Sequence, residues 1–98
     1  MLLLNARHEV LRRVLVSRGS LNASIVHPRE VFRPAIIASA ASMVLVHNHP
    51  SGDPEPSEED VAITRRLAQV GDVHGITVLD HVVVAKGGFV SLRARGSL

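Results

Sequence analysis

The chain has 98 residues, of which 46% are hydrophobic, and a net charge of +2 at pH 7, which fits one small domain with a buried core. The scattered basic residues do not indicate a nucleic-acid-binding surface, and no apolar run is long enough to cross a membrane or resembles a signal peptide. The absence of cysteine excludes disulfides and thiolate metal sites, and it is compatible with the cytoplasmic location that we expect.

The first part of the chain is predicted to form two strands. Met1–Leu4 is an apolar, strand-like segment, a turn at residues 5–8 follows it, and Val10–Ser17 continues as a second strand. Residues 18–22 are predicted to be a loop. If Met1–Leu4 lies at the edge of the sheet, its free backbone groups favour pairing with a second copy, so a homodimer is one expected assembly.

A helix is predicted to begin at Pro28, because proline suits the first turn of a helix. Its apolar stripe is expected at Phe32, Ile36 and Ala40. Pro34 lies inside this helix and is expected to kink it.

The second part of the chain alternates strand and helix. Ser42–His47 is predicted to be a buried strand, and the proline-rich residues 49–56 form a loop. A helix follows from Ser57 to about His74, with Ile63, Leu67 and Val70 on its apolar face and Gly75 at its end.

The last predicted elements are a strand and a hairpin. Ile76–Ala85 is rich in β-branched residues, and Gly87-Gly88 marks a turn into a short partner strand at Phe89–Leu92. Residues 93–98 are expected to be a frayed end. The fold class is therefore α/β or α+β, a mixed sheet with covering helices.

The strongest functional signal is a group of three possible metal ligands. His47 and His49 are two residues apart at a strand end, which places both imidazoles on one face. Asp60 follows in the first turn of the next helix, across a loop stiffened by three prolines. Two imidazoles and a carboxylate are the protein ligands of a catalytic zinc site with an open fourth position. We therefore predict one divalent ion, zinc, at this site.

Structural roles are the alternative for these side chains. Ser57 and Asp60 have the spacing of a helix capping box, and two histidines near a strand end can be polar residues at the rim of a sheet. Glu55, in the same loop, could approach a water on the metal, although nothing in its spacing requires this. His81 is either a partner of the metal ligands or a satisfied residue of the sheet.

The run from His47 to Asp60 resembles the motif of the JAMM (MPN+/JAB) metalloproteases. That motif has His-x-His, seven residues, Ser, two residues and Asp, and each element is present here. The segments Val26–Phe32 and Leu79–His81 are similar to the RadC-like branch of bacterial JAMM proteins, and the likeness extends from about Leu2 to Leu92.

This resemblance implies a cytidine-deaminase-like (JAB/MPN) α/β fold and a zinc hydrolase acting on peptide or isopeptide bonds of a protein substrate. It assigns His47, His49 and Asp60 to the metal and makes Ser57 the catalytic residue. The hydroxyl of Ser57 would stabilise the oxyanion while a metal-bound water attacks the carbonyl.

The sequence departs from the family at the general base. In JAMM proteins a glutamate ahead of the strand matched by Leu2–Leu4 takes the proton of the attacking water, and we find no equivalent in this chain. We therefore expect a single RadC-like domain over residues 1–98 that lacks its N-terminal portion, and we leave its activity open. The alternatives are a non-catalytic zinc-binding or interaction module and a DNA-repair-associated factor, the latter by family association alone.

Overall fold

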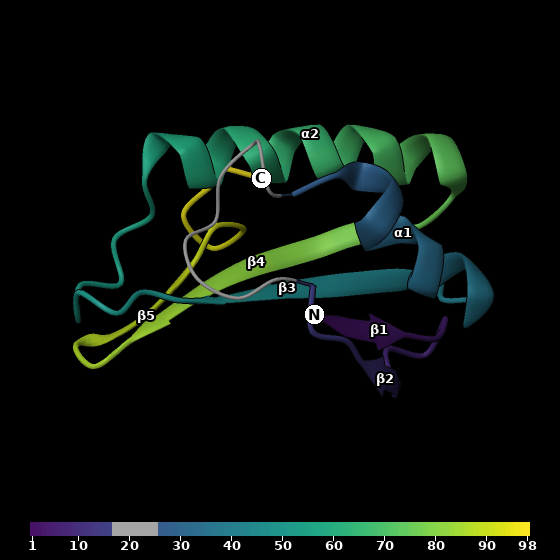
Figure 1. Cartoon of the computed structure of the whole chain (residues 1–98), viewed down its shortest axis with the longest axis horizontal. Coiled ribbons are helices and arrows are strands. Elements are labelled where there is room, and N and C mark those ends of the chain that lie inside the picture. The colour runs from purple at the N-terminus through teal and green to yellow at the C-terminus, as the bar shows by residue number, and fades with distance from the viewer. Residues whose placement is uncertain (17–25) are drawn as a thin grey trace.

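Five strands and two helices follow one another in the computed structural model, which describes residues 1–16 and 26–98 (Figure 1). In chain order they are β1 Leu2–Leu4, β2 Val10–Arg13, α1 Pro28–Ile37, β3 Ser42–Asn48, α2 Glu58–His74, β4 Thr77–Ala85 and β5 Gly88–Ser91. None of the described helices is both long and apolar enough to cross a membrane.

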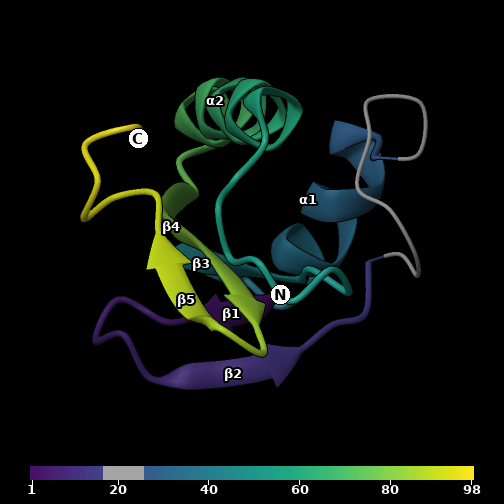
Figure 2. The same cartoon turned by 90° about the vertical axis from the view of Figure 1, so that its left-hand side faces the viewer.

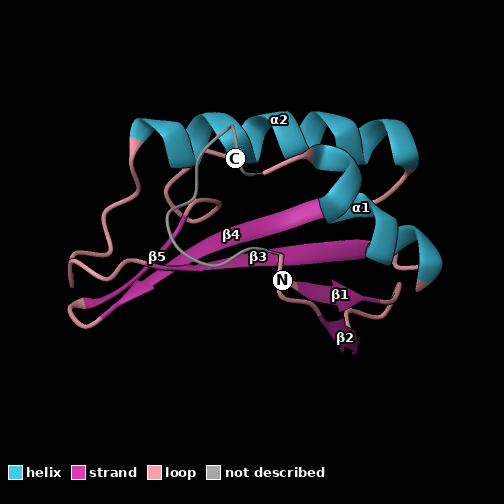
Figure 3. Ribbon diagram, viewed as in Figure 1, coloured by secondary structure: helices cyan, strands magenta, loops and turns pink. Residues whose placement is uncertain are grey.

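The strands form one mixed sheet in the order β2-β1-β3-β4-β5. β3 and β4 are parallel and are connected through α2, whereas the other neighbouring pairs are antiparallel. Both helices lie on the same face of the sheet (Figures 2 and 3). The predicted α/β class, a mixed sheet flanked by helices, is therefore confirmed.

The core lies between this face of the sheet and the two helices. Phe32 from α1 and Leu67 from α2 are each 2% exposed and pack against strand residues such as Met43. Gly71 permits this packing, since a β-carbon there would lie 2.3 Å from the carbonyl oxygen of Ile76 and 3.4 Å from the ring of Phe32. The end of α2 can thus approach the start of β4 closely.

The first two strands differ from their predicted extents. β2 ends at Arg13, and among the described residues it pairs with β1, a strand of three residues. β1 lies between β2 and β3, so the prediction of Met1–Leu4 as an edge strand is wrong and β2 is the edge instead. The loop predicted at residues 18–22 lies outside the described residues.

α1 begins at Pro28 as predicted and continues across Pro34. Its buried side chains are Val31, Phe32 and Ala35, while Ile36 is 53% exposed. Ala40 is buried, but it lies beyond the end of the helix. The predicted stripe was therefore correct at Phe32 and wrong at Ile36.

The C-terminal residues are held against the domain, contrary to the predicted frayed end. The N–H of Ser97 donates to the carbonyl of Leu92, and Leu98 packs against the core. The guanidinium of Arg95 donates two hydrogen bonds to the carboxylate of Glu55, at 2.5 and 2.8 Å. Glu55 is therefore engaged with Arg95 and was wrongly considered as a group that approaches the metal site.

Candidate metal centre

Three elements position the side chains of the candidate metal centre. His47 is the last residue but one of β3, and His49 follows directly after this strand. The N–H of His49 donates to the carbonyl of Val84, which extends the pairing with β4 past the end of β3. Asp60 is the third residue of α2 and is 1% exposed. The strand end and the helix start thus face each other across residues 50–56.

The loop between these elements is fixed by the turn that joins β4 to β5. The N–H of Gly87 donates to the carbonyl of Gly52 at 2.9 Å. A β-carbon at Gly87 would lie 2.8 Å from that oxygen, so only glycine allows this approach. Gly52 itself has a φ of +87°, which glycine adopts without strain. The ion pair of Glu55 and Arg95 holds the other part of the loop.

The predicted ligands come together around the carboxylate of Asp60. Nε2 of His49 lies 3.1 Å from Oδ2, and Nδ1 of His47 lies 3.6 Å from Oδ1. One nitrogen or oxygen from each of the three residues lies within 4.8 Å of the others. Ligands on a tetrahedral zinc are about 3.3 Å apart, since each bond is about 2.0–2.1 Å long. The His-His-Asp group can therefore hold a metal ion.

The hydrogen bonds of His49 show why a cation suits this group. Nδ1 lies 3.1 Å from the carbonyl oxygen of Asp53, which only accepts, and Nε2 faces the carboxylate of Asp60, which also accepts when ionised. A neutral imidazole has one N–H and cannot donate to both. If the hydrogen is on Nδ1, a lone pair on Nε2 faces a negative oxygen. A cation between these two atoms removes the repulsion.

His47 supports the same conclusion. Its Nδ1 is buried and has no hydrogen-bond partner among the described residues. Burial lowers the pKa of His47, the charge of His49 lowers it further, and the charge of Asp60 acts in the opposite direction. Neutral imidazole is the form that binds a metal. His47 and His49 side chains are 15% and 16% exposed, so solvent and ligands can reach the group.

The carboxylate of Asp60 is held in its ionised form. Burial raises its pKa, but hydrogen bonds from Ser57 and the two nearby histidines lower it by more, so that the net shift is downward. The N–H of Ser57 donates to Oδ2 at 2.8 Å. An ionised carboxylate is the form of Asp60 that a divalent ion needs.

Ser57 is the N-cap of α2, so the structural alternative for this residue is confirmed. Its Oγ accepts the N–H of Asp60 at 3.0 Å, and the carboxylate of Asp60 accepts the N–H of Ser57, which completes the capping box. The hydroxyl keeps its own hydrogen, which is available to the carboxylate or to a substrate oxygen. The hydrogen bonds of the cap therefore do not prevent the predicted catalytic role of Ser57.

Ser57→Ala is expected to lower the free energy of unfolding by about 1 kcal/mol, because the N–H of Asp60 loses its acceptor. Ser57→Asn is the matched control, since asparagine caps helices as well as serine does and should keep the wild-type stability. Urea unfolding followed by circular dichroism measures both variants. Equal stability of Ser57→Ala and the wild type would contradict a stabilising cap.

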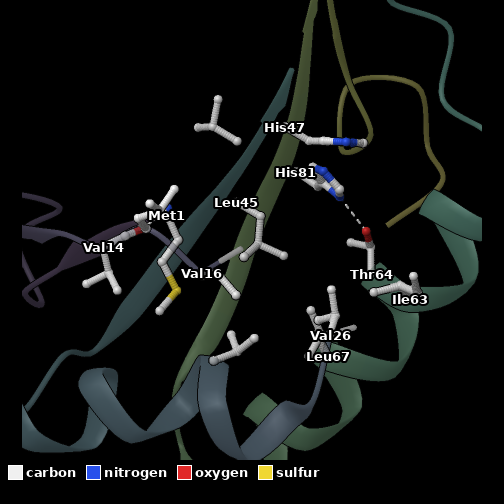
Figure 4. Close-up of a pocket in the computed structure, with 13 residues that line it drawn as sticks. Met1, Val14, Val16, Val26, Leu45, His47, Ile63, Thr64, Leu67 and His81 are labelled. Atoms are coloured by element: carbon white, nitrogen blue, oxygen red, sulfur yellow. Dashed lines mark hydrogen bonds between the residues drawn. The ribbon is translucent and has the colours of Figure 1, made fainter. Parts of the chain in front are cut away.

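His81 lies beside the ligand group but is not part of it. Its side chain is 1% exposed, its ring centre lies 6.0 Å from that of His47, and Nδ1 lies 2.5 Å from Oγ1 of Thr64 (Figure 4). Burial lowers the pKa of His81 to about 4, with a further contribution from the charge of His47, while Asp60 and Asp80 act against it. The ring is therefore neutral at pH 7.

Two contributors to this site were missed from the sequence. Oγ1 of Thr64 donates to the carbonyl of Asp60 at 2.7 Å and so links His81 to the helix that carries Asp60. Thr64 follows Asp60 by four residues on the same helix face, a spacing that could have identified it. The backbone carbonyl of Asp53 orients His49 and gives no signal in the sequence.

Comparison with known proteins agrees with this arrangement. Residues 1–97 match a family model described as the RadC-like JAB domain. The chain is 58% identical to a UPF0758 protein of Pelobacter propionicus, 57% to one of Geobacter sulfurreducens and 60% to one of Symbiobacterium thermophilum. These alignments cover 99% of the chain and 42% of each relative, so the chain spans less than half the length of the curated relatives it matches.

Proposed function

The chain belongs to the RadC-like JAB domain family, and we propose that it is a zinc-dependent hydrolase domain of the JAMM metallopeptidase type. Its substrates would be peptide or isopeptide bonds. The observation that carries the proposal is the His47–His49–Asp60 group, in which two imidazoles and a buried carboxylate lie within 4.8 Å of one another. This donor set fits zinc and leaves a fourth position for water or substrate.

Each residue of the group has a defined part in this proposal. His47, His49 and Asp60 would hold the ion, and the carbonyl of Asp53 keeps Nε2 of His49 free of hydrogen by accepting from Nδ1. A bound zinc ion supplies Lewis acidity, which brings the pKa of a water molecule down to about 7. The hydroxyl of Ser57, fixed by the N–H of Asp60, would donate its hydrogen to the developing oxyanion of the substrate.

A second candidate is a zinc-binding or interaction module without hydrolysis. The JAMM mechanism needs a general base. This second candidate is favoured because two glutamates of the chain form hydrogen bonds with other side chains. The carboxylate of Glu9 accepts a hydrogen bond from Asn5 at the turn after β1, and that of Glu55 pairs with Arg95. A DNA-repair role is supported by no contact or charge pattern in the described residues.

Metal content and peptide hydrolysis, measured on the same protein, separate these candidates. Elemental mass spectrometry is expected to find about one zinc per chain after zinc is supplied and the excess is removed. The zinc-loaded protein is then incubated with a mixture of unstructured peptides, and the products are identified by mass spectrometry. Cleavage that stops with a chelator and returns with zinc supports the hydrolase. One zinc per chain without cleavage supports the module, and a chain that binds no zinc excludes both.

A further inference from the structure

A cavity of about 110 Å³ opens beside the metal ligand His47. Figure 4 shows His47 and His81 one above the other at one end of it, with aliphatic side chains from several elements around the rest. Leu45 comes from β3, and Ile63 and Leu67 come from α2. Further aliphatic lining comes from Met1, Val14 and Val26. The cavity therefore joins an apolar space to the edge of the metal centre.

His81 adds one unsatisfied acceptor to this apolar lining. Oγ1 of Thr64 has a single hydrogen, and the carbonyl of Asp60 accepts it at 2.7 Å. Oγ1 must then accept at the 2.5 Å contact with His81, so the ring carries its hydrogen on Nδ1. Nε2 is left with a lone pair, and this atom is buried without a hydrogen-bond partner among the described residues. A buried acceptor of this kind is stabilised by a ligand that brings a donor.

We propose that this cavity is a specificity pocket that takes one aliphatic side chain of the substrate, next to the bond that is cut, while Nε2 of His81 accepts an N–H of the same peptide. The proposal rests on the proposed hydrolase function, since only a hydrolase has a bond to cut. The size agrees with one branched side chain, because an apolar cavity of about 150 Å³ holds a molecule as large as benzene. Water alone fits less well, since a buried water needs about three polar partners and most of this lining is aliphatic.

Small peptide mimics test the pocket without any turnover. The probes are N-acetyl-leucine N-methylamide, its glycine counterpart, and the leucine analogue in which the acetylated N–H is replaced by an ester oxygen. Binding to the metal-loaded chain is followed by NMR through the methyl signals of Leu45, Ile63 and Leu67. The leucine amide is expected to bind at least about 10-fold more tightly than the glycine amide, because it buries a side chain. The ester should bind about 3- to 10-fold more weakly than the leucine amide, because Nε2 loses its donor.

A matched pair of variants locates the binding. Ile63→Phe should fill the cavity and abolish the preference for leucine, whereas Ile36→Phe makes the same change at an exposed position of α1 and should preserve it. If Ile63→Phe does not fold, the comparison of the three probes on the wild type still decides. Equal binding of the leucine and glycine probes, or signal changes outside the cavity, would overturn the pocket.

The outcome is distinguishable from a failure of the proposed function. If the chain binds the leucine probe in the cavity but cleaves no peptide, the aliphatic ligand site is supported and the hydrolase proposal is rejected. If the chain cleaves peptides with no preference for an aliphatic residue beside the cut bond, the hydrolase proposal is supported and the specificity pocket is rejected.

Discussion

Replacing Asp60 by asparagine is expected to weaken zinc binding by more than about 100-fold, because loss of a group that merely supports a ligand already costs 10- to 100-fold. Asparagine keeps the shape of the side chain and an oxygen that can accept the N–H of Ser57, so α2 should still begin at the same place. What disappears is the negative charge between His47 and His49. Competition with a chromophoric chelator measures the affinity directly.

Asp72→Asn is the matched control for this variant. It makes the same chemical change on the same helix at an exposed residue outside the ligand group, and it should bind zinc like the wild type. Zinc should also raise the midpoint of thermal unfolding for the wild type and for Asp72→Asn, since a ligand that binds only the folded state stabilises it. Unchanged affinity in Asp60→Asn would show that the third ligand lies elsewhere.

The ligand group could be predicted because each part of it depends on local geometry. The two-residue spacing of His47 and His49 defines one face of β3, and the capping box fixes where α2 begins and hence where Asp60 lies. The proline-rich loop leaves few conformations between these points. Local rules therefore act on all three residues, and the structure brings them together as expected.

The features that were missed depend on contacts between distant parts of the chain. Arg95 pairs with Glu55 forty residues away, and no local pattern at either position indicates it. Val10–Ser17 reads as a long strand, but pairing with the three residues of β1 ends it at Arg13. Likewise, the period of α1 predicted Ile36 on the core side together with Phe32, but Ile36 is 53% exposed while Val31, Phe32 and Ala35 are buried. Tertiary packing overrides pattern in each case.

The stability of the metal-free chain is expected to fall as the pH decreases from about 6.5 to 4, and His81 is the main cause. Its pKa is about 4 in the folded chain, compared with 6.5 for a free histidine. Between these values the unfolded chain binds the additional proton, so acidification favours unfolding. This one group should remove about 3 kcal/mol from the free energy of unfolding by pH 4. Urea unfolding at a series of pH values, with a chelator present, measures the slope.

His81→Asn isolates this contribution, because asparagine does not titrate and its amide can still donate toward Oγ1 of Thr64. The variant should be less stable than the wild type at pH 7 and should lose less stability on acidification. Some loss should remain, because His47, whose pKa is also lowered, is present in both chains. His8→Asn is the control, because His8 is exposed and its φ of +62° suits asparagine. If His81→Asn keeps the full wild-type slope, then His81 is not the buried neutral group that loses stability in acid, and its place between Thr64 and His47 would have to be reconsidered.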